Sequence, residues 1–259
     1  MSDLILVEQE GAIATVVFNR PRLRNAISLA MWQEIRAVTE RLAKEESVRA
    51  IVYRGAGTAA FASGADISEF KELRKDIASA KAYNRETDAA RAAIRDCPKP
   101  TVAMIYGFCM GGAMAIAMAC DLRFAAEGAK FGIPAARLGI VYGLEAVRQL
   151  VDLVGPSCAK DILFSARTFD AHEAVQIGFV NRVLPVSALE AYTFDYLHQL
   201  SANAPLSIKG AKEMIDGIVS GRVGEEQLHQ LTIAVFDSHD YREGVQAFLE
   251  KRPPRFEGR

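Results

Sequence analysis

The sequence has almost no net charge, because 31 Lys and Arg residues stand against 32 Asp and Glu residues. No overall positive field attracts a nucleic acid, so we expect no nucleic-acid partner. Cysteine is also scarce: Cys97, Cys109, Cys120 and Cys158 are spaced 12, 11 and 38 residues apart. Without a C-x-x-C pair they fit neither a zinc ribbon nor a redox motif, and we expect buried, reduced thiols and no metal.

Long apolar runs are limited to one segment, residues 102–120, whose nineteen residues carry no charge. That length reaches a bilayer span, but three glycines interrupt the run and its second half is mostly Ala and Met. We therefore expect a buried strand followed by a buried helix, and no membrane partner. Asp3 and Glu8 occupy an N-terminal stretch without a basic region, so we expect no signal peptide and a cytoplasmic protein.

The rest of the composition is that of a globular protein, with 50% hydrophobic and 24% charged residues. Two β-rich runs in residues 4–18 surround Glu10-Gly11 and predict a hairpin, and Ser28 is placed to cap a helix. Short strands at 50–53, 101–105, 122–125 and 180–184 alternate with helices, which indicates an α/β fold with a mostly parallel sheet. After residue 187 the periodicity is helical only. We expect a core over 1–204 and a helical region over 205–259.

Some familiar motifs fail on inspection. Gly55–Ala60 matches G-x-G-x-x-A, but the glycine-rich loop continues to Ala65 and no helix starts before about Asp66. A surface turn is favoured over a nicotinamide site. Ser63 lies in A-S-G and not in G-x-S-x-G, so a serine hydrolase is not indicated. The four histidines have no orienting carboxylate at a useful spacing, and we expect all of them at the surface.

Two loops place backbone N–H groups at a helix start after a buried strand: residues 63–66 and residues 109–113. Such amides favour negative charge, and two of them directed at one oxygen would form an oxyanion hole. The alternative is that the small residues only permit close packing. The sequence pattern leaves both interpretations open.

Several motifs, in order along the chain, resemble those of the crotonase (enoyl-CoA hydratase/isomerase) family. They are Asn19-Arg20-Pro21 with Arg24-Asn25-Ala26, Phe61 to Ile67, Lys99 to Ala103, Gly107 to Gly112, Ala119 to Arg123, Phe131 to Pro134, Gly178 to Val183 and Phe248 to Arg252. The resemblance covers essentially the whole chain.

This resemblance implies a crotonase-like spiral of β-β-α turns, an acyl-CoA substrate without a separate cofactor, and a homotrimer or dimer of trimers. The N–H groups of Ala65 and Gly112 would be the oxyanion donors. Phe248 and Lys251 resemble the pair that a neighbouring subunit offers to the CoA nucleotide. The residues that would line the CoA path are Arg22, Arg24, Ala26, Ala62, Ser63, Asp66 and Ile67.

The chain departs from the family at two positions. Hydratases of this type use two glutamates to ionise the attacking water, and here the corresponding residues are Ala115 and Ala135. Alanine can neither accept nor deliver a proton. We therefore expect a family enzyme that forms an oxyanion-stabilised enolate but hydrates enoyl-CoA poorly.

The remaining polar candidates nearby are Arg137, Tyr142 and Glu145. Tyr142 resembles a tyrosine of methylmalonyl-CoA decarboxylase-type members, although a buried tyrosine that only packs against the spiral is favoured by the sequence. Glu145 would be either a displaced base for isomerisation or a solvated residue in a first helical turn. A decarboxylase-like enzyme that uses Tyr142 and a non-catalytic acyl-CoA-binding protein are the alternatives to a lyase or isomerase.

Overall fold

The computed structural model describes residues 3–221 and 224–259, apart from the side chain of residue 228. The strands are β1 (Ile5–Glu10), β2 (Ile13–Phe18), β3 (Ala50–Gly55), β4 (Ala60–Ala62), β5 (Thr101–Ile105), β6 (Phe108–Met110), β7 (Leu122–Ala126), β8 (Lys130–Gly132), β9 (Thr168–Asp170) and β10 (Arg182–Leu184). The helices are α1 (Leu29–Lys44), α2 (Phe70–Leu73), α3 (Ile77–Arg95), α4 (Gly112–Ala119), α5 (Leu144–Ser165), α6 (Ala171–Gln176), α7 (Leu189–Ser201), α8 (Pro205–Ser220), α9 (Glu225–Phe236) and α10 (His239–Glu250). Short 3₁₀ turns cover Pro21–Leu23, Ile67–Glu69 and Pro134–Leu138.

The strands of the described residues form two sheets, of six strands in the order β1-β2-β3-β5-β7-β10 and of four in the order β4-β6-β8-β9. β1 and β2 are antiparallel, whereas β2, β3, β5, β7 and β10 are parallel. Successive turns of chain repeat one path: a strand in the larger sheet, a strand in the smaller sheet, then a helix, as in β5-β6-α4 and β7-β8-α5. The predicted α/β spiral of β-β-α turns is confirmed.

The central strands of the larger sheet, β2, β3, β5 and β7, are buried on both faces. Ile51 and Tyr53 of β3 pack into the main core with α1, whereas Ala50 and Val52 face the opposite side. That opposite side is covered by α7, where Tyr192 and Tyr196 meet Phe124 edge to face at 5.4 and 5.2 Å. Burial on both faces explains the continuous apolar runs of these strands.

The local predictions hold where the signals are strong. The predicted hairpin is β1-β2, and the Ser28 hydroxyl accepts a hydrogen bond of 3.3 Å from the Met31 amide at the start of α1. The strand at 101–105 is β5. Cys97, Cys109 and Cys120 are buried and free as expected, whereas Cys158 is only half-buried.

Other local predictions need correction. The loop expected from Gly55 to Ala65 contains β4, because its short strand gains parallel pairing with β6. As predicted, no helix starts directly after the G-x-G-x-x-A segment. The helix expected near Asp66 begins as a 3₁₀ turn, with the Asp66 carboxylate accepting from the Ser68 amide. The strand expected from 180 begins at Arg182, because the Val180 amide bonds the Ala174 carbonyl instead.

The uncharged run 102–120 divides into β5, β6 and α4, so its apolar character comes from burial inside the fold. Among the residues that the structure describes, no helix combines the length and apolarity needed to cross a bilayer.

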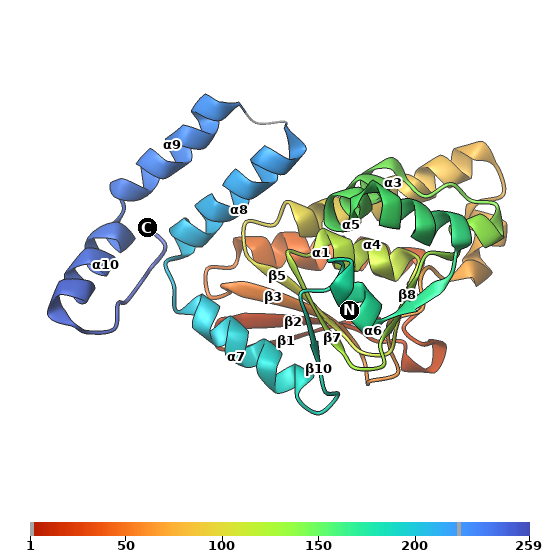
Figure 1. Cartoon of the computed structure of the whole chain (residues 1–259), viewed down its shortest axis with the longest axis horizontal. Helices are drawn as coiled ribbons and strands as arrows, with labels where there is room; N and C mark the ends of the chain where they lie inside the picture. Colours follow the sequence, from red (N-terminus) through yellow and green to blue (C-terminus); the bar gives the residue numbers. More distant parts are fainter. Residues whose placement is uncertain (1–2, 222–223) are drawn as a thin grey trace.

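The last three helices, α8 to α10, extend away from the two sheets in Figure 1. α8 is joined to the core by an ion pair of 3.0 Å between the Lys212 Nζ and Asp121. Large apolar side chains along these helices are exposed, among them Ile218 at 67% and Phe248 at 84%. The expected boundary at 204/205 lies just before α8 and stays a prediction; residues 1–2 and 222–223 of the two expected regions lie outside the described residues.

Arg123 holds the C-terminal end of α4 and thereby the position of the loop before that helix. Its side chain is 3% exposed and donates to the carbonyls of Cys120 and Phe179 at 2.7 Å and of Ala117 at 3.3 Å. These acceptors include α4 carbonyls that have no partner within the helix.

Replacing Arg123 by Met is expected to destabilise the fold by about 3 kcal/mol, because it leaves buried carbonyls without donors. Urea unfolding followed by circular dichroism measures this as a lower midpoint at unchanged slope. Arg182→Met is the control, since the exposed Arg182 donates only to its neighbour's carbonyl, Asn181, among the described residues. Equal midpoints for the two variants would contradict the assigned role of Arg123.

Candidate functional site

The segment before α1 and the segment after β4 lie side by side. The Ser63 amide donates to the Arg24 carbonyl, the Ile27 amide to the Gly64 carbonyl and the Asp66 amide to the Ile27 carbonyl, each at 2.9 Å. The two stretches predicted to line the CoA path, 22–26 and 62–67, are therefore neighbours, although they are forty residues apart in the chain.

Asn25 fixes this pairing from within. Its side chain is 1% exposed, donates to the carbonyls of Ala60 at 2.8 Å and Ala56 at 3.2 Å, and accepts from the Arg20 amide at 3.1 Å. Its φ of 55° lies in the left-handed region, which Asn tolerates better than most residues. The Arg20 guanidinium adds an ion pair of 2.8 Å to Asp66, and hydrogen bonds from Ser68 and Arg20 hold the pKa of Asp66 below its usual value.

The other predicted CoA-path residues differ in exposure. Arg22 and Arg24 are exposed, and the Arg24 guanidinium lies 4.9 Å from the centre of the Phe108 ring. Ile67 is 56% exposed, whereas Ala62 is buried and Ala26 is half-buried. The Ser63 hydroxyl donates to the Leu23 carbonyl at 3.3 Å.

The backbone amides of Ala65 and Gly112 come together where this segment meets the start of α4. A Cβ at position 112 would lie 3.4 Å from the Ala65 nitrogen, and a Cβ at position 64 would lie 3.8 Å from the Gly112 nitrogen and 3.0 Å from the Met110 carbonyl. Gly64 also has a φ of 107°, so this approach requires glycine. Neither amide donates a hydrogen bond within residues 3–221 and 224–259.

Tyr142 contacts the peptide unit that carries the Gly112 amide. Its hydroxyl donates to the Gly111 carbonyl at 2.9 Å, and that carbonyl also accepts from the Ala115 amide at 3.2 Å. The Gly111 φ of 49° turns this peptide at the helix start. Burial raises the pKa of the Tyr142 hydroxyl well above its usual value, an effect that the nearby Arg91 partly offsets, so the hydroxyl stays protonated at neutral pH.

The resemblance predicted that Ala115 and Ala135 take the positions of the two hydratase glutamates. Ala115 is in the first turn of α4 and 3% exposed, and Ala135 is half-buried in the 3₁₀ turn that starts at Pro134. The Pro134 ring would lie 3.8 Å from a Cβ at position 111, so this turn borders the same loop. The two short side chains leave the neighbourhood of the amides without a carboxylate at these positions.

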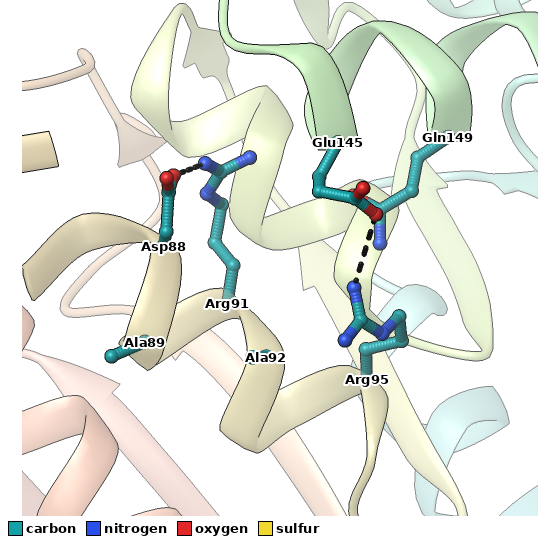
Figure 2. A pocket seen from close by; sticks show the side chains of 7 residues that line it. All are labelled: Asp88, Ala89, Arg91, Ala92, Arg95, Glu145 and Gln149. Atoms are coloured by element: carbon teal, nitrogen blue, oxygen red, sulfur yellow. Dashed lines mark hydrogen bonds and ion pairs between the residues drawn. The ribbon is translucent and has the colours of Figure 1, made fainter. Parts of the chain in front are cut away.

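Glu145 belongs to a different contact network, between α3 and α5 (Figure 2). Its carboxylate forms ion pairs with Arg95 at 3.6 Å and Arg148 at 3.8 Å. A cavity of about 280 Å³ lies beside these groups and is also lined by Arg91 and Gln149. This placement favours ion pairing in the first turn of α5 over a base directed at the two amides.

Phe248 and Lys251 are not brought to the Ala65 and Gly112 amides within one chain. Both are exposed at the end of α10, in the helical extension seen in Figure 1. Lys251 ends the helix with a φ of 55°. Their expected role toward CoA therefore needs a neighbouring subunit and stays a prediction.

The histidines are peripheral to this site. His172, His198 and His229 are exposed, as expected. His239 is half-buried and its ring nitrogen lies 3.8 Å from the Asp240 carboxylate, a neighbour that the spacing argument overlooked.

Two buried residues were missed as site candidates: Trp32, which lies next to Gly112, and Tyr83, which is adjacent to Trp32. Trp32 was predicted only as part of the apolar face of α1, yet its ring carbon Cζ2 would lie 3.2 Å from a Cβ at position 112. Tyr83 lies on α3 and is 4% exposed. No motif marks either residue, since both look like ordinary core positions in an amphipathic helix.

Comparisons with known proteins agree with the resemblance. The sequence pattern of the enoyl-CoA hydratase/isomerase family matches residues 8–259. A short-chain-enoyl-CoA hydratase of Clostridium acetobutylicum is 33% identical over 96% of this chain and 95% of its own length. A methylmalonyl-CoA decarboxylase of Escherichia coli is 32% identical over 95% of each chain. The crystal structure of an enoyl-CoA hydratase/carnithine racemase from Magnetospirillum magneticum superposes with a TM-score of 0.96 at 37% identity, covering 100% of this chain and 97% of that one.

Replacing Tyr142 by Phe is expected to lower the free energy of unfolding by about 0.5–1.5 kcal/mol, because one hydrogen bond to the Gly111 carbonyl is lost while the ring remains. Denaturant unfolding measures the change. Tyr241→Phe is the control, since that side chain is 43% exposed. A Tyr142 variant as stable as the control would show that the bond contributes nothing to holding the loop.

Proposed function

Because this chain belongs to the enoyl-CoA hydratase/isomerase family, we propose that it is a lyase or isomerase that acts on an acyl-CoA thioester through an oxyanion-stabilised enolate. The observation that carries the proposal is the approach of the Ala65 and Gly112 amides at a helix start, without a hydrogen-bond acceptor in the described residues. Two such donors stabilise the negative charge that develops on a thioester oxygen when electrons are delocalised from the α-carbon.

The enolate form of the reaction follows from what lies around these donors. Hydration needs a group that removes a proton from water, and Ala115 and Ala135 cannot do this. Tyr142 supports the donor peptide instead: its bond to the Gly111 carbonyl polarises the same amide unit whose N–H belongs to Gly112. The site is thus equipped to stabilise charge and poorly equipped to activate water.

A decarboxylase is the second candidate, and the position of Tyr142 favours it. In loss of CO₂ from a 2-carboxyacyl thioester, the C–C bond breaks and its electron pair passes into the enolate, so no base is needed to form the anion. Protonation of the α-carbon then completes the reaction. The likeness to the E. coli methylmalonyl-CoA decarboxylase is compatible with this route.

A non-catalytic acyl-CoA-binding protein is the third candidate, and the two alanines favour it. Such a protein would keep the donor amides and the CoA path but turn over no ester. A nicotinamide-dependent oxidoreductase has no support, because β4 and not a helix follows the Gly55–Ala60 segment.

Hydration of crotonyl-CoA by the wild-type protein is expected to be slower than hydration by a two-glutamate family member by about 10²–10⁴ for each absent acid. Turnover of crotonyl-, malonyl- and methylmalonyl-CoA, measured side by side, separates the three candidates. Fast hydration would contradict the proposal and would require another acid at the site. Binding of all three esters without turnover would favour the non-catalytic alternative.

Gly112→Pro removes one donor, since proline has no N–H and suits the first position of a helix. We expect turnover of the preferred ester to fall by about 10²–10³. Gly224→Pro is a matched control, because Gly224 has a φ of −72° at the exposed start of α9. If the Gly112 variant is folded by circular dichroism and retains full turnover, Gly112 is not a donor.

We also propose a homotrimer or dimer of trimers in which Phe248 and Lys251 of one subunit approach the CoA bound to the next. The exposed apolar residues of α8 to α10 and the exposed Lys251 support this arrangement. Light scattering is expected to give three or six times the chain mass of 28.2 kDa. A monomer at micromolar concentration would exclude the arrangement. Within an intact oligomer, Lys251→Ala is expected to weaken binding of CoA itself.

A further inference from the structure

The single tryptophan of the sequence lies against the proposed reaction site. Trp32 is 2% exposed, and its Cζ2 would lie 3.2 Å from a Cβ at Gly112. In an indole ring, Cζ2 and Nε1 are bonded to the same carbon, Cε2. The ring atoms nearest that Cβ position are Cζ2 and Cη2, at 3.2 and 3.8 Å, so the benzene edge of the indole faces Gly112 and Nε1 lies two bonds away from Cζ2.

Tyr83 is a second buried polar group in the same place. Its side chain is on α3 and 4% exposed. Burial raises the pKa of the Tyr83 hydroxyl, and the neighbouring Trp32 N–H and Arg74 guanidinium partly offset this effect. The Trp32 and Tyr83 side chains are thus adjacent.

Neither Trp32 Nε1 nor the Tyr83 hydroxyl has a hydrogen-bond partner of normal geometry within the part of the chain that the structure describes, although the Trp32 N–H is close enough to lower the pKa of the Tyr83 hydroxyl. An unpaired buried donor costs free energy, and native proteins contain few of them. A pocket for a plain hydrocarbon chain would avoid that cost with phenylalanine at both positions. The two donors therefore call for an acceptor that the chain does not supply.

We propose that Trp32 and Tyr83 select an acyl group that carries a hydroxyl or carbonyl oxygen a few carbons beyond the thioester, over an unsubstituted alkyl group. The inference rests on the proposed function, since it places the thioester oxygen at the Ala65 and Gly112 amides. Such a site discriminates strongly, because the analogue without the oxygen leaves both donors unpaired.

The chemistry of the donors favours a neutral oxygen over a carboxylate. An indole N–H and a phenol O–H are uncharged. Their hydrogen bonds offset the desolvation free energy of a buried carboxylate less than an ion pair with a cation does. The Arg74 guanidinium lies against aromatic faces, with its central carbon 4.6 Å from the Phe70 ring centre and 4.8 Å from that of Tyr83. It donates to the Asn84 side chain at 2.6 Å, while its buried Nε has no partner among the described residues.

The helix that packs against Tyr83, α2, is short. α2 contains four residues, and its Phe70 meets Tyr83 edge to face at 5.6 Å. The proposal requires an acyl group to displace the side chains of Phe70 and Arg74, which contact Tyr83.

The test compares CoA thioesters of equal chain length: pentanoyl-, 3-hydroxypentanoyl-, 4-hydroxypentanoyl-, 4-oxopentanoyl- and glutaryl-CoA. Binding is measured by calorimetry and by the emission of Trp32, which is the protein's sole tryptophan and so reports on this site. We expect at least one hydroxy or oxo ester to bind about tenfold more tightly than pentanoyl-CoA and to shift the emission.

Tyr83→Phe and Trp32→Phe are each expected to remove this preference, measured by calorimetry as the ratio of the affinities for the oxygenated and pentanoyl esters. Tyr196→Phe, on the far face of the larger sheet, is the matched control and is expected to keep the wild-type ratio. Tyr83→Phe retains the ring and is the variant to use if Trp32→Phe fails to fold. Equal affinities for pentanoyl and oxygenated esters, a preference for glutaryl-CoA, or a preference that survives both substitutions would overturn the inference while leaving the proposed function intact. If the folded wild type binds none of the esters, the proposed function itself fails.

Discussion

The packing of the Ala65 amide against Gly112 is the constraint on which the rest of the site depends. β4 and β6 pair in parallel, so the chain leaves both strands at the same edge of the smaller sheet. Asn25 and Gly64 then position the two loops relative to each other. Asn25 donates a hydrogen bond to the Ala60 carbonyl, and Gly64 adopts a φ of 107° where it packs against the Met110 carbonyl. The strand pairing, the Asn25 hydrogen bond and the Gly64 conformation each reduce the conformational freedom of the chain. Together they leave the Ala65 and Gly112 amides without an acceptor in the described chain. Such preorganised strain is typical of sites that bind a developing charge.

The surroundings of these amides favour stabilisation of a negative charge over transfer of a proton. Charge stabilisation is well provided for, since Tyr142 supports the donor peptide and the start of α4 adds a favourable dipole. Proton transfer is not, because Ala115 and Ala135 carry no titratable group and Glu145 pairs with arginines of α3 and α5. Specificity is assigned instead to uncharged donors, Trp32 and Tyr83. This combination fits two kinds of acyl-CoA substrate. In one, a breaking C–C bond supplies the electron pair of the enolate; in the other, the α-proton becomes mobile once the enolate is stabilised.

Much of this could be predicted from the sequence, and the remainder has physical reasons for being hidden. The Ser28 cap, the hairpin and β5 follow from local signals that need no distant partner. The strands of the smaller sheet, β4, β6, β8 and β9, have three residues each and are too short to show a period, so only the family resemblance implied them. Both donor loops were identified, but their convergence depends on pairing between β4 and β6. Trp32 and Tyr83 occupy ordinary buried positions on amphipathic helices, and only the absence of a partner for their polar atoms in the described structure distinguishes them.

The central claim is that the Ala65 and Gly112 amides polarise a thioester carbonyl. Isotope-edited infrared difference spectroscopy of a bound acyl-CoA, labelled with ¹³C at the thioester carbonyl, observes that bond directly and requires no turnover. The account predicts a carbonyl band at lower wavenumber than for the same ester in water, and a return toward the solution value in folded Gly112→Pro. A bound ester whose carbonyl band equals the solution value in the wild-type protein would contradict it.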